Sequence, residues 1–230
     1  MARAKKLKGG GIFLHIPKTG GSFVSRVLKD TGLFVRSING PDHNDIDRVF
    51  APVTTWKRDI LRYYFKWCIG GYPGKNPYMF TFVRHPLSWY ESWFKHCSKH
   101  QHWHHGDERE WHPVRRLNGL GNPDFNNFVR GVAQKWPGFV TEMFSQYTGP
   151  PVAFIGKQEN LVEDLTTALK HLGPEVDEDF IRKYKRVNIS VEPKENDVVW
   201  DPDLRKQIYQ LEYAGIVRYG YEKMDLHQPD

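Results

Sequence analysis

Cysteines and long apolar runs are both scarce in this chain of 230 residues. Its two cysteines, Cys68 and Cys97, are too few for a disulfide framework and lie in segments with a helical pattern, which fits a reducing compartment. No apolar run approaches the ~18 residues that a spanning helix needs, and the N-terminus lacks the apolar core of a secretory signal. These absences predict a soluble, cytoplasmic protein without a membrane segment. A chain trimmed of an anchor would show the same pattern.

The chain also lacks internal repeats and long linkers. Its length is enough for one substantial core, so we expect a single domain over residues 1–230. Residues 1–10 contain a cluster of basic side chains and are predicted to form a flexible basic tail. The formal net charge of +6 suits a polyanionic ligand. Nucleic acid is disfavoured as a partner, because the other basic residues are scattered rather than gathered in one stripe. The oligomeric state is left open.

Apolar runs and helical stripes alternate along the sequence, which predicts an α/β fold with a parallel sheet covered by helices. The dipeptides Asn122-Pro123 and Asp201-Pro202 are typical helix starts, with a capping residue followed by proline. The expected strands are 11–16, 33–38, 78–83 and 152–156, and the expected helices lie near 20–30, 54–68, 86–98, 123–135, 158–172, 177–185 and 201–213.

The segment HIPKTGGS, from His15 to Ser22, joins a short apolar run to a predicted helix. Gly20 and Gly21 can adopt backbone angles that turn successive N–H groups toward one anion, and the helix that follows adds its positive dipole end. Lys18 supplies a positive charge. The lysine precedes the glycines, which departs from the nucleoside-triphosphatase loop. The segment therefore predicts a phosphate cradle, with a plain strand–turn–helix junction as the alternative.

A second segment, TFVRHPLSWYESWF, repeats this design. Arg84 stands where an apolar strand should end, at the edge where open α/β sheets bind ligands. Ser92 lies on the helix that follows and can turn its hydroxyl toward whatever Arg84 binds. Arg84 paired with a carboxylate is the alternative. Two anion sites on successive junctions imply a ligand phosphorylated at both ends.

These residues resemble the sulfotransferases that use 3′-phosphoadenosine 5′-phosphosulfate (PAPS). HIPKTGGS is similar to that family's 5′-phosphosulfate loop, and Arg84 with Ser92 is similar to its 3′-phosphate motif. Three later segments resemble the carbohydrate sulfotransferase branch with its bacterial and viral relatives: Phe154 to Leu165, Val187 to Ser190, and Tyr219 to Glu222. The resemblance runs from about Ile12 to Glu222. It implies a P-loop NTPase-like parallel sheet flanked by helices on both faces.

The activity implied is transfer of the sulfuryl group from PAPS to a hydroxyl acceptor such as a carbohydrate, with adenosine 3′,5′-bisphosphate as product. Lys18 would neutralise charge growing on the bridging oxygen of the leaving phosphate. Thr19, Gly20, Gly21 and Ser22 would bind the 5′-phosphate through backbone N–H groups, with added bonds from the Thr19 and Ser22 hydroxyls. Lysine, loop and helix dipole can do the work that Mg²⁺ does in kinases, so this chemistry requires no metal.

The base that takes the acceptor's proton is predicted to be His43, since relatives carry a histidine or a carboxylate at this place and its ordinary pKa near 6.5 suits the task. Asp42, Asp45 and Asp47 remain alternatives. Two residues near the weaker C-terminal motif, Arg186 and Ser190, are candidates for the 3′-phosphate. Aromatic residues are too common to select an adenine slot.

The stretch from His96 to His112 is rich in histidine. His96, His100 and His104 share the spacing of one helix face and suit a transition metal, whereas the absence of an accompanying cysteine favours a polar insertion near the acceptor site. Two alternatives to a sulfotransferase stay open. One is a P-loop kinase of a small metabolite, and the other is a silent nucleotide- or glycan-binding module of the same fold.

Overall fold

The computed structural model describes residues 4–37, 77–100, 103, 113–173, 176–184 and 198–222. At its centre lies a five-stranded sheet in the order β3-β1-β2-β4-β5. The strands are β1 (Lys5–Leu7), β2 (Ile12–Leu14), β3 (Phe34–Ser37), β4 (Met79–Val83) and β5 (Val152–Lys157). β2, β4 and β5 run parallel, and β1 is antiparallel to both of its neighbours. The four strands expected from the apolar runs are confirmed, but the sheet is mixed rather than parallel throughout.

Strand β1 corrects the prediction of a flexible basic tail over residues 1–10. Lys5 and Leu7 are buried, and the Lys5 ammonium lies 5.1 Å from the centre of the Phe34 ring. β1 is followed by the short 3-10 helix η1 (Lys8–Gly10). The strand has three residues and two lysines, too little for a periodic apolar signal. Its hydrogen bonds come from β2 and β3, so only the assembled sheet defines it.

The helices follow the predicted pattern closely where the structure describes them. Helix α5 (Phe125–Lys135) is capped by Asp124, whose side chain accepts from the Asn127 N–H, so the expected start at Asn122-Pro123 is wrong by two residues. The expected start at Asp201-Pro202 is confirmed. Two further helices, α6 (Phe139–Ser145) and α10 (Tyr213–Arg218), have no counterpart among the helices expected from the sequence. The expected helix at 54–68 lies outside the described residues. The helices are α1 (Gly21–Asp30), α4 (Pro86–His100), η2 (Pro113–Leu117), α5 (Phe125–Lys135), α6 (Phe139–Ser145), η3 (Gln158–Asn160), α7 (Leu161–Lys170), α8 (Glu178–Lys183), α9 (Pro202–Leu211) and α10 (Tyr213–Arg218).

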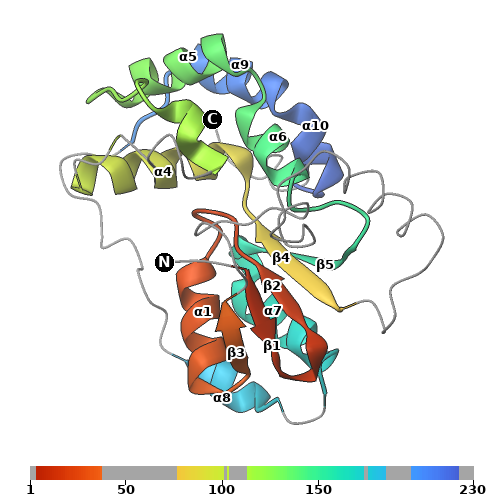
Figure 1. The fold of residues 1–230 in the computed structure, drawn as a ribbon. Coiled ribbons are helices and arrows are strands. Elements are labelled where there is room, and N and C mark those ends of the chain that lie inside the picture. Colours follow the sequence, from red (N-terminus) through yellow and green to blue (C-terminus); the bar gives the residue numbers. More distant parts are fainter. Residues whose placement is uncertain are drawn as a thin grey trace, which may run out of the picture.

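Alternate side chains of the central strands enter two separate cores. Phe13, Phe80 and Phe82 pack with residues of α1, α7 and α8, whereas Leu14 and Val83 pack with residues of α4, α5, α6, α9 and α10. This period of two is that of a strand buried on both faces. Figure 1 shows the two helical layers, with α1 and α8 beside the N-terminal strands and the larger group around α4.

Glu212 holds the larger layer together from the end of α9. Its carboxylate is fully buried and accepts hydrogen bonds from Tyr90 Oη at 2.8 Å and from the backbone N–H groups of Val140 and Thr141 at 3.0 and 2.7 Å. Those two N–H groups belong to the first turn of α6, which has no capping side chain at Gly138. A carboxylate on a helix N-terminus is stabilising, so Glu212 fixes the start of α6.

Candidate active site

The loop between β2 and α1 has the backbone of an anion cradle. Lys18 has a φ of 65°, a left-handed conformation that is uncommon for a residue with a side chain. Gly20, the N-cap of α1, has a φ of 85° and a ψ of 6°, and no side chain caps the helix there. The first-turn N–H groups of α1 therefore face the loop without a capping oxygen. An anion placed there would meet both N–H donors and the helix dipole.

Close packing requires glycine at both positions after Thr19. A Cβ on Gly20 would lie 2.5 Å from Leu161 Cδ2, and one on Gly21 would lie 1.7 Å from His15 Cδ2. His15 thus packs against the loop. The Thr19 hydroxyl is buried and donates to the Ile16 carbonyl at 3.0 Å, so it braces the loop from inside; the expected side-chain bond from Thr19 to a phosphate is not favoured.

Strand β4 and helix α4 hold this loop from the neighbouring junction. Thr81 Oγ1 donates to the Leu14 carbonyl at 2.8 Å, and Trp89 Nε1 donates to the Pro17 carbonyl at 2.9 Å. Arg84 Nη1 reaches the Lys18 carbonyl at 3.5 Å. The structure therefore brings together the two cationic residues that the sequence placed on successive strand ends.

Arg84 is arranged to bind more than the Lys18 carbonyl. Its Nε is buried and finds no hydrogen-bond partner among the described residues. Burial lowers the pKa of the guanidinium, and the charges of Glu159 and Glu91 oppose that shift. A buried donor without an acceptor is costly, and a phosphate oxygen would satisfy it.

Glu159 anchors the start of α4, a role that the sequence did not suggest. Its Oε1 accepts from the backbone N–H of His85 at 2.8 Å, and its Oε2 accepts from Tyr221 Oη at 3.0 Å. The Tyr221 ring also packs edge-on against the His85 ring. Both Glu159 and Tyr221 stand in segments that carry the family resemblance, which was the available signal. Together they connect η3 and the segment after α10 to His85, the residue that follows Arg84.

The electrostatic surroundings of Lys18, as well as its position, suit the binding of an anion. Burial, and to a smaller extent the charge of the nearby Arg84 guanidinium, lower the pKa of Lys18 from 10.5 to about 8. Two cations and the end of a helix face one another here, a combination that favours binding an anion. Cys97 on α4 is close enough to feel the Lys18 charge, but burial raises the pKa of its thiol to about 12. The thiol is therefore not a nucleophile at neutral pH.

The remaining candidates divide into described and undescribed residues. Ser22 is exposed in the first turn of α1, and Ser92 is half-buried on α4. His43 with its three aspartates, and Arg186 and Ser190, lie outside the described residues, as does His104. His96 and His100 lie on α4 with ring centres 4.9 Å apart. In the described ranges no group of three His, Cys, Asp or Glu side chains is placed to hold a metal ion. Nor do these ranges contain a helix with the length and apolarity to cross a bilayer.

Fold and site together define an α/β protein with a candidate anion cradle where two parallel strands end. The chain belongs to the sulfotransferase family, whose sequence model matches residues 10–222. It is therefore a transferase of sulfuryl groups. Comparisons with curated proteins and with solved structures found no match.

Proposed function

We propose that this sulfotransferase takes its sulfuryl group from PAPS and transfers it to a hydroxyl of a carbohydrate or a similar acceptor. The observation that carries the proposal is that the loop before the uncapped N-terminus of α1 lies beside Arg84: Arg84 Nη1 donates to the Lys18 carbonyl at 3.5 Å, and the buried Arg84 Nε finds no partner among the described residues. A donor with phosphates at both its 5′ and 3′ positions would occupy both features at once.

Each residue of the cradle takes a distinct role in this proposal. The backbone N–H groups from Thr19 to Ser22 bind the 5′-phosphate. Lys18 faces the oxygen that bridges sulfur and this phosphate, where negative charge develops as the bond breaks. Arg84 holds the 3′-phosphate, with the Ser92 hydroxyl beside it and Arg186 and Ser190 as further contacts. The transfer needs no metal ion, since lysine, N–H groups and helix dipole neutralise the developing charge.

The proposed base is His43, which would accept the proton of the attacking hydroxyl. A neutral imidazole is needed for this step, so we expect kcat/KM to rise with pH through an apparent pKa of roughly 6 to 7 and then level off. Replacing His43 with alanine should remove that limb and lower the rate by about 10²- to 10⁴-fold. If the variant keeps the limb and most of its rate, Asp45 or Asp47 becomes the candidate.

The donor is tested by calorimetry with adenosine 3′,5′-bisphosphate, AMP and ATP with Mg²⁺. We expect the bisphosphate to bind more tightly than AMP by about tenfold or more, since only the bisphosphate engages Arg84. Preference for ATP with Mg²⁺ would instead support a small-molecule kinase. Transfer of radiolabelled sulfate from PAPS to a panel of hydroxyl acceptors then separates an enzyme from a silent binding module.

A further inference from the structure

Two carboxylates lie close enough to Arg84 to act on its charge, yet neither is bonded to it. Burial lowers the pKa of the Arg84 guanidinium, and the charges of Glu159 and Glu91 act in the opposite direction. Among the described residues, Arg84 donates to the Lys18 carbonyl and to no carboxylate, and its buried Nε has no partner. Charged groups that are withdrawn from water are usually paired, so this separation of opposite charges needs a cause.

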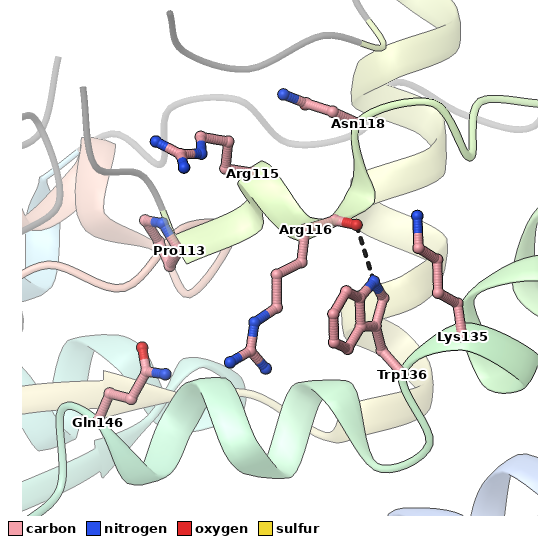
Figure 2. A pocket seen from close by; sticks show the side chains of 7 residues that line it. All are labelled: Pro113, Arg115, Arg116, Asn118, Lys135, Trp136 and Gln146. Atoms are coloured by element: carbon pink, nitrogen blue, oxygen red, sulfur yellow. Dashed lines mark hydrogen bonds between the residues drawn. The ribbon is translucent and has the colours of Figure 1, made fainter. Parts of the chain in front are cut away.

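Other arginines of the described chain are bonded to the carboxylate beside them. Arg116, which lines the cavity shown in Figure 2, donates to Glu142 Oε1 at 2.6 Å. Arg130 donates to Asp201 Oδ2 at 2.9 Å. Both pairs are exposed to water, where an ion pair gains little. Arg84 is less exposed and would gain more from a carboxylate, so its open donors depend on what the neighbouring carboxylates bind instead.

Both carboxylates accept hydrogen bonds from other donors. Glu159 Oε1 accepts from the His85 N–H at 2.8 Å, and Glu159 Oε2 accepts from Tyr221 Oη at 3.0 Å. Glu91 Oε1 accepts from Trp200 Nε1 at 2.8 Å. Each oxygen of Glu159 therefore has a donor other than the arginine. The hydroxyl and the indole come from the C-terminal part of the chain, outside the two strand–helix junctions.

Tyr221 is fixed in the orientation that this contact requires. Its side chain is fully buried, and its ring packs edge-on against the His85 ring with centres 5.2 Å apart. The Lys157 ammonium lies 4.7 Å from the centre of the Tyr221 ring and donates to the Gly220 carbonyl at 2.7 Å. The ring and the residue before it are thus both held, which directs the hydroxyl at Glu159 before any ligand arrives.

We propose that Tyr221 is a positioning residue for the donor: its hydroxyl holds the Glu159 carboxylate away from Arg84 and so keeps the guanidinium open to the 3′-phosphate. This inference rests on the proposed function, which supplies that phosphate. Without the hydroxyl, Glu159 Oε2 is open to water and to the Arg84 guanidinium. An ion pair formed there has to break before the phosphate binds. Tyr221 acts through Glu159, so its effect disappears when residue 159 carries no charge.

The first measurement is calorimetry of the full chain with adenosine 3′,5′-bisphosphate and with AMP. Tyr221→Phe removes the hydroxyl and keeps the ring. It should weaken binding of the bisphosphate by about three- to tenfold and change AMP affinity by less than about twofold, because the competing ion pair blocks Arg84 alone. Unchanged affinity for the bisphosphate would overturn the proposal, and so would an equal loss for both nucleotides.

A double-mutant cycle separates this role from a structural one. In Glu159→Gln the side chain is neutral and competes only weakly for Arg84. Adding Tyr221→Phe to that variant should change the bisphosphate affinity by less than about twofold. If the loss persists in the Glu159→Gln background, it comes from the packing of the C-terminal segment, and the proposal is wrong.

The matched control is Tyr219→Phe. Tyr219 lies in the same segment, and its hydroxyl is bonded to Thr148 Oγ1 at 2.8 Å rather than to a carboxylate near Arg84. The substitution removes one buried hydroxyl and changes no charge, so the bisphosphate affinity should stay within about twofold of the native value. A loss as large as that in Tyr221→Phe would overturn the proposal in favour of a general loosening of the segment.

The second measurement needs no donor. In proton–nitrogen NMR of the free chain, the guanidinium signals of Arg84 are assigned by their loss in Arg84→Lys. They should move downfield in Tyr221→Phe, as Glu159 accepts from them, and should stay near their native positions in the double variant. Unmoved signals in Tyr221→Phe would overturn the proposal. If the native chain binds AMP as tightly as the bisphosphate, the proposed function fails, while these signals still decide whether Tyr221 keeps Glu159 from Arg84.

Discussion

The two strand–helix junctions of the candidate active site present positive charge in different ways. At the β2–α1 junction the positive charge comes largely from backbone N–H groups. Lys18 and Gly20 have φ angles of 65° and 85°, and α1 begins without a capping side chain. At the β4–α4 junction the strand passes into the helix within two residues, and a side chain, Arg84, is presented. Glu159 accepts the N–H of the next residue.

This difference indicates that different kinds of substitution should impair anion binding at the two junctions. The first depends on space and on rare backbone angles, so an added methyl group damages it. The second depends on a buried guanidinium and its carboxylate neighbours, so a change of charge or of hydrogen bonding damages it. Each expectation below acts on one junction and leaves the other in place.

The largest effect is expected at Lys18. Lys18→Ala should lower kcat by about two to three orders of magnitude with a smaller change in donor affinity, because its charge is needed most in the transition state. Lys18→Arg should restore little, since a planar guanidinium does not replace a compact ammonium. The measurement is initial rates at saturating PAPS. Native kcat in the alanine variant would remove Lys18 from the mechanism.

Arg84→Ala should weaken binding of adenosine 3′,5′-bisphosphate by about ten- to several-hundredfold while leaving AMP affinity nearly unchanged. The physical reason is loss of the buried donors proposed to meet the 3′-phosphate. Calorimetry with both nucleotides gives the ratio directly. The control is Arg130→Ala, which breaks an exposed pair with Asp201 of 2.9 Å and should leave the ratio unchanged. A parallel loss of AMP binding would show that Arg84 serves the whole loop instead.

Gly21→Ala tests the dependence of the first junction on space. The added Cβ would meet His15 at 1.7 Å, so His15 must move, and the free energy of unfolding should fall by about 1–3 kcal/mol. Gly131→Ala in α5 is the matched control. No atom lies within 4 Å of its added Cβ, and it should raise the free energy of unfolding by about 0.5–1 kcal/mol. Urea titration of both variants measures the contrast, and equal shifts would contradict it.

The pH dependence of donor binding follows from the depressed pKa of Lys18, which is about 8 in the free protein. A bound phosphate stabilises the ammonium and raises this pKa, so binding takes up a proton above pH 8 and affinity falls there. Between pH 8 and pH 9 we expect affinity to fall by about fivefold, with a plateau below pH 7 as far as Lys18 is concerned. Lys18→Arg should remove this dependence, because arginine stays charged. If the Lys18→Arg variant shows the native pH dependence of donor affinity, the titrating group is not Lys18.

The smallest effect is expected at Glu159. Glu159→Gln leaves either the His85 N–H or the Tyr221 hydroxyl without its acceptor, and should lower the free energy of unfolding by about 1–3 kcal/mol, nearer the lower value because the site is only partly buried. Tyr221→Phe removes the donor of one bond and leaves the partly buried Glu159 Oε2 open to water, while the bond from His85 stays, so it should cost about 1 kcal/mol or less. Thermal unfolding compares the two. A larger loss of unfolding free energy in Tyr221→Phe than in Glu159→Gln would contradict the view that the Glu159 carboxylate is the main anchor of α4.

Much of the fold followed from local patterns. The apolar runs predicted β2, β3, β4 and β5, and the caps and stripes predicted most of the described helices. The sequence predicts anion sites at the loop from His15 to Ser22 and at Arg84, and the structure brings Arg84 into contact with that loop. That these residues bind an anion stays a prediction. The proposed base His43, with Arg186 and Ser190, lies outside the described residues and stays a prediction.

The sequence by itself determined where the chain turns and where its cationic residues stand relative to strand ends, because glycine, proline and short apolar runs act on neighbouring residues. The tertiary structure alone decided the antiparallel β1, the start of α6 and the anchor at Glu159. Glu159 meets its partners 74 and 62 residues away, and Glu212 meets Tyr90 across 122 residues. Such partners are chosen by the closing of the fold, and no local periodicity encodes them.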